Sequence, residues 1–251
     1  MNKFLLALQF LTILPVKIKD FQEKNLAQSL ILFPLVGLML GIVLAIAHNL
    51  LNLLYFNELA VSVSVIVLLT ILTGGMHLDG LADTFDAFLS RKNKDEMLAI
   101  MRDSRTGAMG VNRLISAILL TTVFFSSLNP SIKIPGLILM CVLSRWAMVY
   151  SIFLFPYARQ EGKAGIFIRG VSRKIFFWAT GITLLIVFFT FHFKGLLIWV
   201  VVALIAYLID RLISNKIDGL TGDTLGALNE MIEVIVLFLL CVLVRSGLCL
   251  I

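Results

Sequence analysis

Seven long apolar runs follow one another along this chain and constrain its fold more than any other feature. They lie at about 30–54, 59–76, 111–128, 132–156, 176–193, 195–210 and 229–251. A helix of about 20 apolar residues crosses the hydrocarbon core of a bilayer. Hydrophobic residues make up 60% of the 251 and charged residues only 14%, against roughly a quarter charged in soluble domains. The sequence therefore predicts an all-α, polytopic integral membrane bundle of about seven transmembrane helices, forming a single domain over residues 1–251.

The basic residues predict how the chain is oriented in the membrane. Short cytoplasmic loops collect Lys and Arg. With the amino terminus inside, only Lys133, Lys194 and Arg245 fall on the outer side, while Arg145 lies within a span. The polar segments then face the cytoplasm. We expect the protein to lie in the cytoplasmic (inner) membrane. The net charge of +6 reflects this topology and attraction to lipid headgroups, not nucleic-acid binding.

The first residues, MNKFLLALQFLTILP, are too short an apolar run to cross a bilayer. Lys3 precedes the run, as in a signal peptide, but Pro15 and a mixed basic segment follow it in place of a small-residue cleavage site. We expect a short interfacial or re-entrant helix here.

The stretch from Gly74 to Gly110 carries six carboxylates in an otherwise apolar chain. Asp79, Asp83 and Asp86 stand at i, i+4 and i+7, a spacing that places all three on one face of a helix. Stacked carboxylates repel one another unless a cation neutralises them, and hard oxygen ligands select Mg²⁺, Mn²⁺ or Ca²⁺. The pattern predicts metal-assisted phosphate chemistry. The two glycines at 74 and 75 predict a bend that carries this acidic face to the membrane surface.

Two further features flank the acidic face. His77 precedes it and is a candidate general base, metal ligand or merely interfacial side chain. After it comes a cationic, hydroxylic and glycine-rich loop at the start of a span, of the kind that binds a diphosphate through guanidinium groups and backbone amides. Its candidate substrate-binding residues are Arg102, Asp103, Ser104, Arg105 and Gly107.

A second segment of glycines, hydroxyls and carboxylates, from Asp218 to Glu230, stands at another predicted cytoplasmic span entrance. Asp223 and Glu230 are seven residues apart and so share a helical face. Two such segments on one side of the membrane indicate a shared site. Arg145 is costly inside a span and should pair with an acid or an anionic ligand.

The motifs HLDGLADTFDA, MRDSRTGAMG and GLTGDTLGALNE, with FLTILP and FPLVGLMLG nearer the amino terminus, resemble those of the cobalamin synthases, the adenosylcobinamide-GDP ribazoletransferases. The likeness spans the chain. It implies transfer of the adenosylcobinamide phosphate moiety from adenosylcobinamide-GDP to α-ribazole or its 5′-phosphate, with release of GMP. The resemblance leaves open whether the chain forms a homo-oligomer or associates with other enzymes of the cobalamin pathway.

That chemistry suggests roles for the candidate residues. As a hypothesis, Mg²⁺ is held against the diphosphate by Asp79, Asp83 and Asp86, with His77 or an unliganded carboxylate (Asp79 or Asp83) as the base. Arg102, Arg105 and Arg145 would balance phosphate charge. Asp223, Glu230 and Asn229 would complete the metal site or orient the ribazole.

Two other classes of protein share part of this pattern. The CDP-alcohol phosphotransferases of lipid synthesis also use DG-containing acidic helices, and DGLAD is close to their pattern, but the later GxxxDxxxD portion is missing. A cation transporter should place its acids near mid-span, whereas these acids cluster at span ends beside basic residues.

Overall fold

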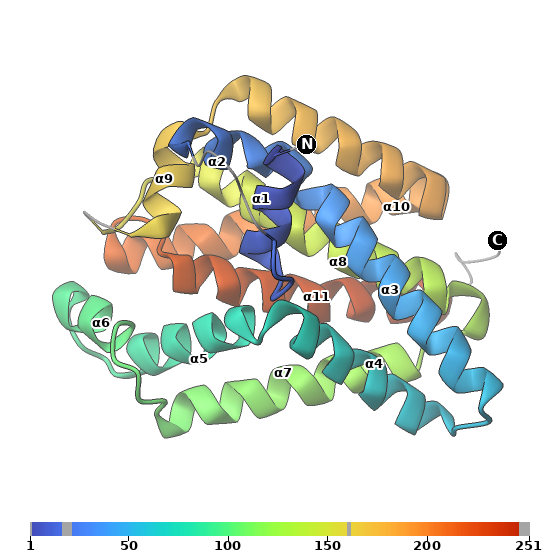
Figure 1. The fold of residues 1–251 in the computed structure, drawn as a ribbon. Helices are drawn as coiled ribbons and strands as arrows, with labels where there is room; N and C mark the ends of the chain where they lie inside the picture. The colour runs from blue at the N-terminus through green and yellow to red at the C-terminus, as the bar shows by residue number, and fades with distance from the viewer. Residues whose placement is uncertain (1, 17–21, 160–161, 246–251) are drawn as a thin grey trace.

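The computed structural model describes residues 2–16, 22–159 and 162–245, and helices dominate this part of the chain (Figure 1). The last residues of the run at 229–251 lie outside the described residues. In chain order the elements are α1 (Asn2–Leu11), α2 (Glu23–Ser29), the 3-10 turn η1 (Leu30–Leu32), α3 (Phe33–Leu53), α4 (Glu58–Thr73), α5 (Met76–Leu89), α6 (Lys94–Ile100), α7 (Ala108–Ser126), α8 (Pro130–Leu154), α9 (Lys163–Gly170), α10 (Arg173–Ile217) and α11 (Gly222–Arg245). The all-α prediction is confirmed.

Five helical segments among the described residues are long and apolar enough to cross a membrane, and six if the bent pair α4 and α5 forms one span. The chain is thus a multi-pass membrane protein, but the expected count of seven is not confirmed. The difference lies partly in α10, which covers both expected runs at 176–193 and 195–210 with two joined helices but counts as one of the five segments. It is broken at His192, whose φ of 49° and ψ of −138° are not helical. α1 is short, as predicted, with 10 residues.

Helix α8 forms the centre of the bundle and packs against α3, α10 and α11 (Figure 1). Most of its side chains are buried, including Trp146 and Arg145. Two glycines of α3 let it approach closely: a β-carbon on Gly37 would lie 2.9 Å from the Cα of Val142, and one on Gly41 only 2.7 Å from that of Ile138. Small residues four apart serve this purpose in membrane helices, so the predicted packing role of these glycines is confirmed.

The chain bends by 88° between α4 and α5, as the two glycines predicted. Gly74 and Gly75 both adopt the left-handed conformation, with φ of 65° and 68°, which costs glycine little. Helix α5 then runs alongside α11 and α7 toward the end of the molecule that also holds α6 and α9 (Figure 1).

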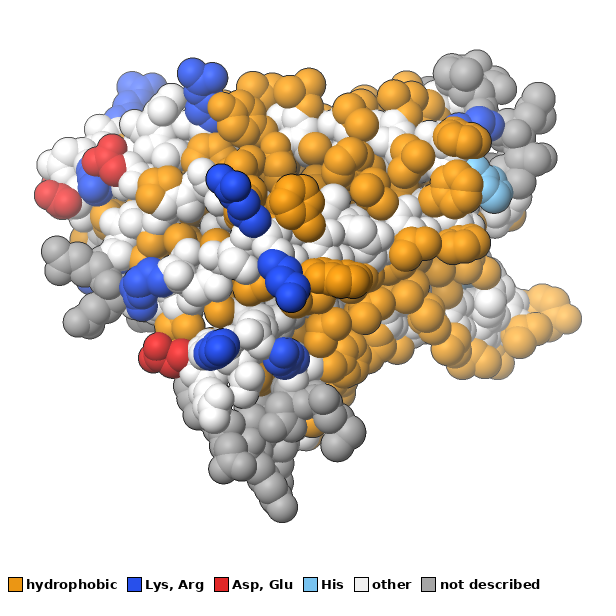
Figure 2. All heavy atoms as spheres, turned by 90° about the horizontal axis from the view of Figure 1, so that it is seen from above, with side chains coloured by type: hydrophobic (Ala, Val, Ile, Leu, Met, Phe, Trp, Pro, Cys, Tyr) orange, Lys and Arg blue, Asp and Glu red, His pale blue; other side chains and the backbone are white. Residues whose placement is uncertain are grey.

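Charge is distributed unevenly over the surface. In the face drawn in Figure 2, acidic side chains and most basic ones lie toward the end that holds α6 and α9, and orange apolar side chains cover the remainder of that face. Exposed large apolar residues such as Leu119 and Phe189 belong to the spans. The apolar surface is the part that lipid would cover.

Candidate active site

Helices α5 and α11 carry the two acidic motifs, and they cross at a pair of glycines. A β-carbon on Gly80 would lie 2.6 Å from the backbone oxygen of Asp223, and one on Gly226 would lie 3.2 Å from the Cα of His77. At Gly80 a larger residue would clash with the backbone of Asp223, and at Gly226 it would be in tight contact with α5. The crossing brings the start of the acidic face of α5 against the first turn of α11, so the predicted proximity of the two motifs is observed.

A cavity of about 300 Å³ opens at this crossing. His77 and Asp79 of α5 line it together with Asp223 of α11 and Arg159 from the α8–α9 connection. Its remaining wall is mostly apolar and comes from α1, α8, α9 and α11, with Phe10 and Phe167 in edge-to-face contact at ring centroids 4.6 Å apart. Asp83 lies one turn beyond Asp79 on the same face of α5.

Arg159 is the functional candidate that sequence reasoning missed. Its guanidinium donates to the carboxylate of Asp223 at 2.7 Å. Backbone contacts fix this pairing, since the amide of Ala158 donates to the carbonyl of Leu220 at 2.9 Å and that of Leu220 donates to the carbonyl of Pro156 at 2.8 Å. In the sequence, Arg159 is one of several basic residues in a cytoplasmic segment, and nothing in its neighbours distinguishes it.

The turn into α11 is built by its own hydroxyls. The amide of Thr221 donates to Oγ1 of Thr224 at 2.8 Å, and the amide of Thr224 donates back to Oγ1 of Thr221 at 3.1 Å. Gly219 has a φ of 146°, and a β-carbon there would lie 2.5 Å from the carbonyl oxygen of Pro156. The glycines and hydroxyls of this motif therefore hold Asp223 in the cavity wall.

His77 is almost fully buried, with 1% of its surface exposed. Neither ring nitrogen has a hydrogen-bond partner in the structure. A buried imidazole without partners is unusual, because burial removes the water that would otherwise satisfy its nitrogens. His77 is also one of the residues that line the cavity.

Asp86 lies apart from this cavity and fixes the loop before α7. One of its oxygens accepts from the amide of Gly107 at 2.6 Å and the other from the amide of Gly110 at 2.8 Å. These are amides of the first turn of α7 and its N-cap, where a carboxylate is stabilising. Asp86 thus attaches the loop to α5.

The loop held by Asp86 contains the exposed Arg102, Ser104 and Arg105 at the same end of the bundle. Arg105 forms a two-pronged pair with Asp103, at 2.6 Å between the guanidinium and Oδ2. These side-chain hydrogen bonds, followed by one from the Arg105 amide, lower the pKa of Asp103 to about 2. The Arg105 side chain remains 87% exposed and accessible to an anion.

Arg145 and Asn229 belong to a buried network beneath the cavity. Arg145 pairs with Glu233, which also accepts from the side-chain amide of Asn229 at 3.1 Å. This satisfies the expectation that Arg145 pairs with an acid. The partner is Glu233, an acid that the sequence analysis did not single out. Glu230 lines two other small cavities. The structure brings none of Arg145, Asn229 and Glu230 into the cavity that holds Asp79.

Among the described residues, no group of three His, Cys, Asp or Glu side chains is arranged to hold a metal ion. Magnesium does not require such a group, because it usually keeps several waters and binds through one or two carboxylates plus substrate phosphates. Asp79 and Asp223 line one cavity and Asp83 adjoins it, so the donor set fits this mode of binding.

The fold and the cavity define a helical multi-pass membrane protein with carboxylates, an imidazole and an arginine gathered at one end of its bundle. The chain belongs to the cobalamin-5-phosphate synthase family, whose model matches residues 3–241.

Three relatives share the name adenosylcobinamide-GDP ribazoletransferase. That of Desulforamulus reducens is 39% identical over 94% of this chain and 94% of its own. The relative from Caldanaerobacter subterraneus subsp. tengcongensis is 36% identical, over 94% and 96% of the two chains. That of Alkaliphilus metalliredigens is 35% identical over 99% and 98%. No solved structure matches the chain.

Proposed function

We propose that this protein transfers the adenosylcobinamide phosphate moiety from adenosylcobinamide-GDP to α-ribazole or its 5′-phosphate and releases GMP, in the nucleotide-loop assembly step of cobalamin biosynthesis. The observation that carries the proposal is the cavity at the α5–α11 crossing. It joins Asp79, His77 and the Asp223–Arg159 pair in a chain of this family. Carboxylates with an arginine suit transfer of a phosphoryl group, where positioning and charge neutralisation do most of the work.

In the proposed reaction, a ribose hydroxyl of the acceptor attacks the phosphorus that bears the cobinamide. The bond from that phosphorus to the bridging oxygen breaks, and GMP leaves with the electron pair. A base in the cavity takes the hydroxyl proton. His77 is our first candidate because it lines the cavity and neither ring nitrogen has a hydrogen-bond partner, with Asp79 or Asp83 as the alternative.

We propose that one or two of the carboxylates of Asp79, Asp83 and Asp223 hold Mg²⁺ together with oxygens of the donor's diphosphate. The ion would supply charge neutralisation of that diphosphate. Arg159 is placed to neutralise Asp223 before substrate arrives and to contact phosphate afterwards. Arg102 and Arg105, exposed on the loop held by Asp86, would reach the GDP portion from outside the cavity.

The proposed location is the cytoplasmic membrane, with the cavity facing the cytoplasm. Support comes from the basic residues, which are concentrated in the predicted cytoplasmic segments. Both substrates are large and polar, so an opening at the aqueous end of the bundle suits them.

The test is GMP release by the protein in liposomes supplied with adenosylcobinamide-GDP and α-ribazole, with product cobamide measured in parallel. We expect equal amounts of both products, lost when either substrate is omitted or when a chelator removes Mg²⁺. Asp83→Asn should lower the rate of GMP release by at least about 100-fold. Asp95→Asn, on the exposed start of α6, is the matched control and should retain it. No turnover by folded wild-type protein would refute the proposal.

A further inference from the structure

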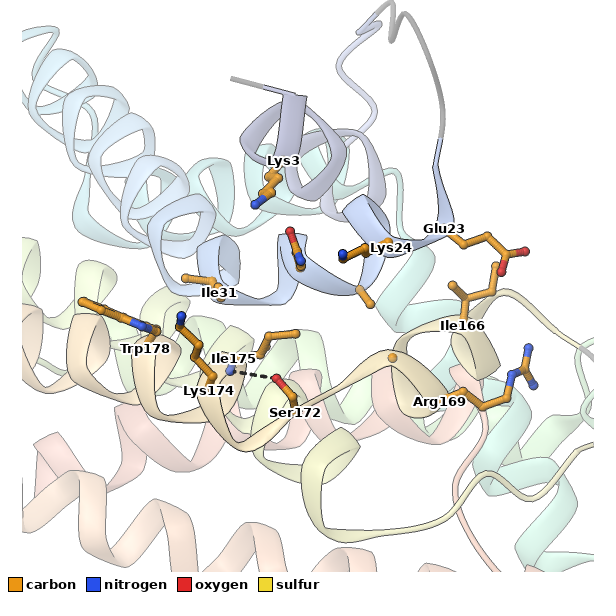
Figure 3. Close-up of a pocket in the computed structure, with 13 residues that line it drawn as sticks. Lys3, Glu23, Lys24, Ile31, Ile166, Arg169, Ser172, Lys174, Ile175 and Trp178 are labelled. Carbon is orange, nitrogen blue, oxygen red and sulfur yellow. Dashed lines mark hydrogen bonds between the residues drawn. The ribbon is translucent and has the colours of Figure 1, made fainter.

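A second, larger cavity lies on the other side of α9 from the candidate active site. Its volume is about 730 Å³, and it is bounded by α1 and α2 on one side and by α9 and the first turns of α10 on the other (Figure 3). It shares no lining residue with the cavity of Asp79. We call this space the basic groove. Nothing in the proposed reaction uses it.

Four cationic side chains line the basic groove, each from a different helix: Lys3 of α1, Lys24 of α2, Arg169 of α9 and Lys174 of α10. Glu23 is the one acid among the lining residues. In Figure 3 the side chain of Lys3 extends from α1 toward α2, that of Lys24 lies along α2, and that of Lys174 extends from α10 toward Ile31. Within the described ranges, none of the four cations forms an ion pair with a carboxylate.

One wall of the basic groove is apolar. Ile31 and Ile175 line it, and Trp178, which is 59% exposed, stands at its edge one turn along α10 from Lys174. In Figure 2 basic side chains on the face seen from above lie where the apolar surface begins. Tryptophan and lysine together at such a boundary are typical of the level of lipid headgroups.

From these contacts we propose that the basic groove binds the headgroup of an anionic phospholipid, with its phosphate among Lys3, Lys24 and Lys174 and an acyl chain along Ile31, Ile175 and Trp178. Cations scattered in cytoplasmic loops by topology alone need no cavity and no apolar wall. Here four helices contribute one cation each to a single concave space that also has an apolar wall.

A lipid bound in the groove would also brace the wall of the catalytic cavity. Helix α9 has Ile166 and Arg169 facing the groove and Ala164 and Phe167 facing the other cavity. We therefore expect bound lipid to slow hydrogen exchange of the amides from Ile166 to Gly170.

The test is native mass spectrometry of the purified full-length protein in a neutral detergent, titrated with dioleoylphosphatidylglycerol or with dioleoylphosphatidylcholine. Wild type should bind one phosphatidylglycerol saturably and at least about tenfold more tightly than phosphatidylcholine, since each headgroup-level cation contributes measurably. Lys24→Gln with Lys174→Gln should weaken phosphatidylglycerol binding at least about tenfold, and each single change should weaken it partly. Arg91→Gln with Lys92→Gln removes the same charge from an exposed turn elsewhere and should leave binding unchanged.

These side chains are exposed, so we expect the variants to fold, and equal thermal midpoints check this. Equal binding of the two lipids, or equal loss in both double variants, would overturn the proposal in favour of non-specific attraction. Displacement of phosphatidylglycerol by millimolar inorganic phosphate alone would also overturn it, because the groove would then be a site for free anions. Slower exchange in α9 with phosphatidylglycerol, absent with phosphatidylcholine, would support it.

Discussion

Arg159 has two roles in the cavity, because it pairs with Asp223 and is also placed to bind phosphate. The arginine keeps Asp223 neutralised in a half-buried position and lies beside the acids that would meet a diphosphate. Removing the arginine both leaves that carboxylate unpaired and deletes a phosphate-binding cation.

We predict that Arg159→Ala lowers kcat/KM for adenosylcobinamide-GDP by about 100-fold, the usual scale for loss of a group that stabilises developing charge. Arg173→Ala is the control. Arg173 is an exposed cation at the start of α10 and lines neither cavity, so its removal should leave the rate within twofold, about the scatter expected of a surface change. Equal effects of the two changes in a steady-state assay would contradict a specific role for Arg159.

His77 provides the second test at this scale. If it is the base, His77→Ala should reduce kcat by about 100-fold or more, the contribution typical of general base catalysis. Substrate affinity should change little. A loss confined to KM, measured over a full substrate range, would instead assign His77 to binding.

The Asp103–Arg105 pair makes a prediction that needs no substrate. Arg105 holds the pKa of Asp103 at about 2, so this carboxyl should stay ionised from neutral pH down to well below its ordinary range. In Arg105→Ala the side-chain hydrogen bonds are lost while the backbone one remains, and the pKa should rise part of the way toward about 3.9. Carboxyl carbon shifts measured by NMR against pH, with Asp103 labelled, would follow this. An Asp103 pKa that is identical in both proteins would contradict the pairing.

At the scale of helices, the α5–α11 crossing decides whether the two acidic motifs form one site. Gly80→Ala would place a methyl group against the backbone of Asp223, and we predict a loss of about 1–3 kcal/mol in stability, the usual cost of overpacking, together with lost activity. Gly181→Ala is the matched control within α10, because its added methyl meets no atom within 4 Å. It should be neutral or slightly stabilising. Thermal unfolding of both variants in the same detergent measures the difference, and equal midpoints would contradict the tight crossing.

Features of the helices that depend on local sequence patterns could be predicted. The acidic face of α5, the bend at Gly74 and Gly75, and the close packing of Gly37 and Gly41 follow from spacing and backbone freedom, and all are observed. Asp86 was expected beside Asp79 for the same reason. Spacing could not reveal that the amides of Gly107 and Gly110 lie opposite its carboxylate, because that depends on how α7 packs on α5.

Contacts between residues far apart in the sequence could not be predicted. Arg145 was expected to need an anionic partner, and Glu233 provides it from 88 residues away. Arg159 acquires its importance only through the backbone contacts between Ala158 and Leu220. Both depend on which helices become neighbours, which hydrophobic patterns do not specify.

For the molecule as a whole, apolar composition and topology predicted a multi-pass helical bundle with its polar chemistry at one end, and the structure has this arrangement. The count of spans was less predictable. The two helices of α10 join at His192 without a gap and therefore count as one span. The bent pair α4 and α5 adds one span if the two helices cross the membrane together, and none otherwise.

If α5 and α11 build a single catalytic site, a double-mutant cycle on GMP release will show that their carboxylates act together. Rates would be measured in liposomes for wild type, Asp79→Asn, Asp223→Asn and the double variant. Residues that act as a unit give strongly non-additive losses, so we predict that the double variant is scarcely slower than the worse single one. Losses that multiply, or full activity in Asp223→Asn, would show that the two motifs do not act in one site.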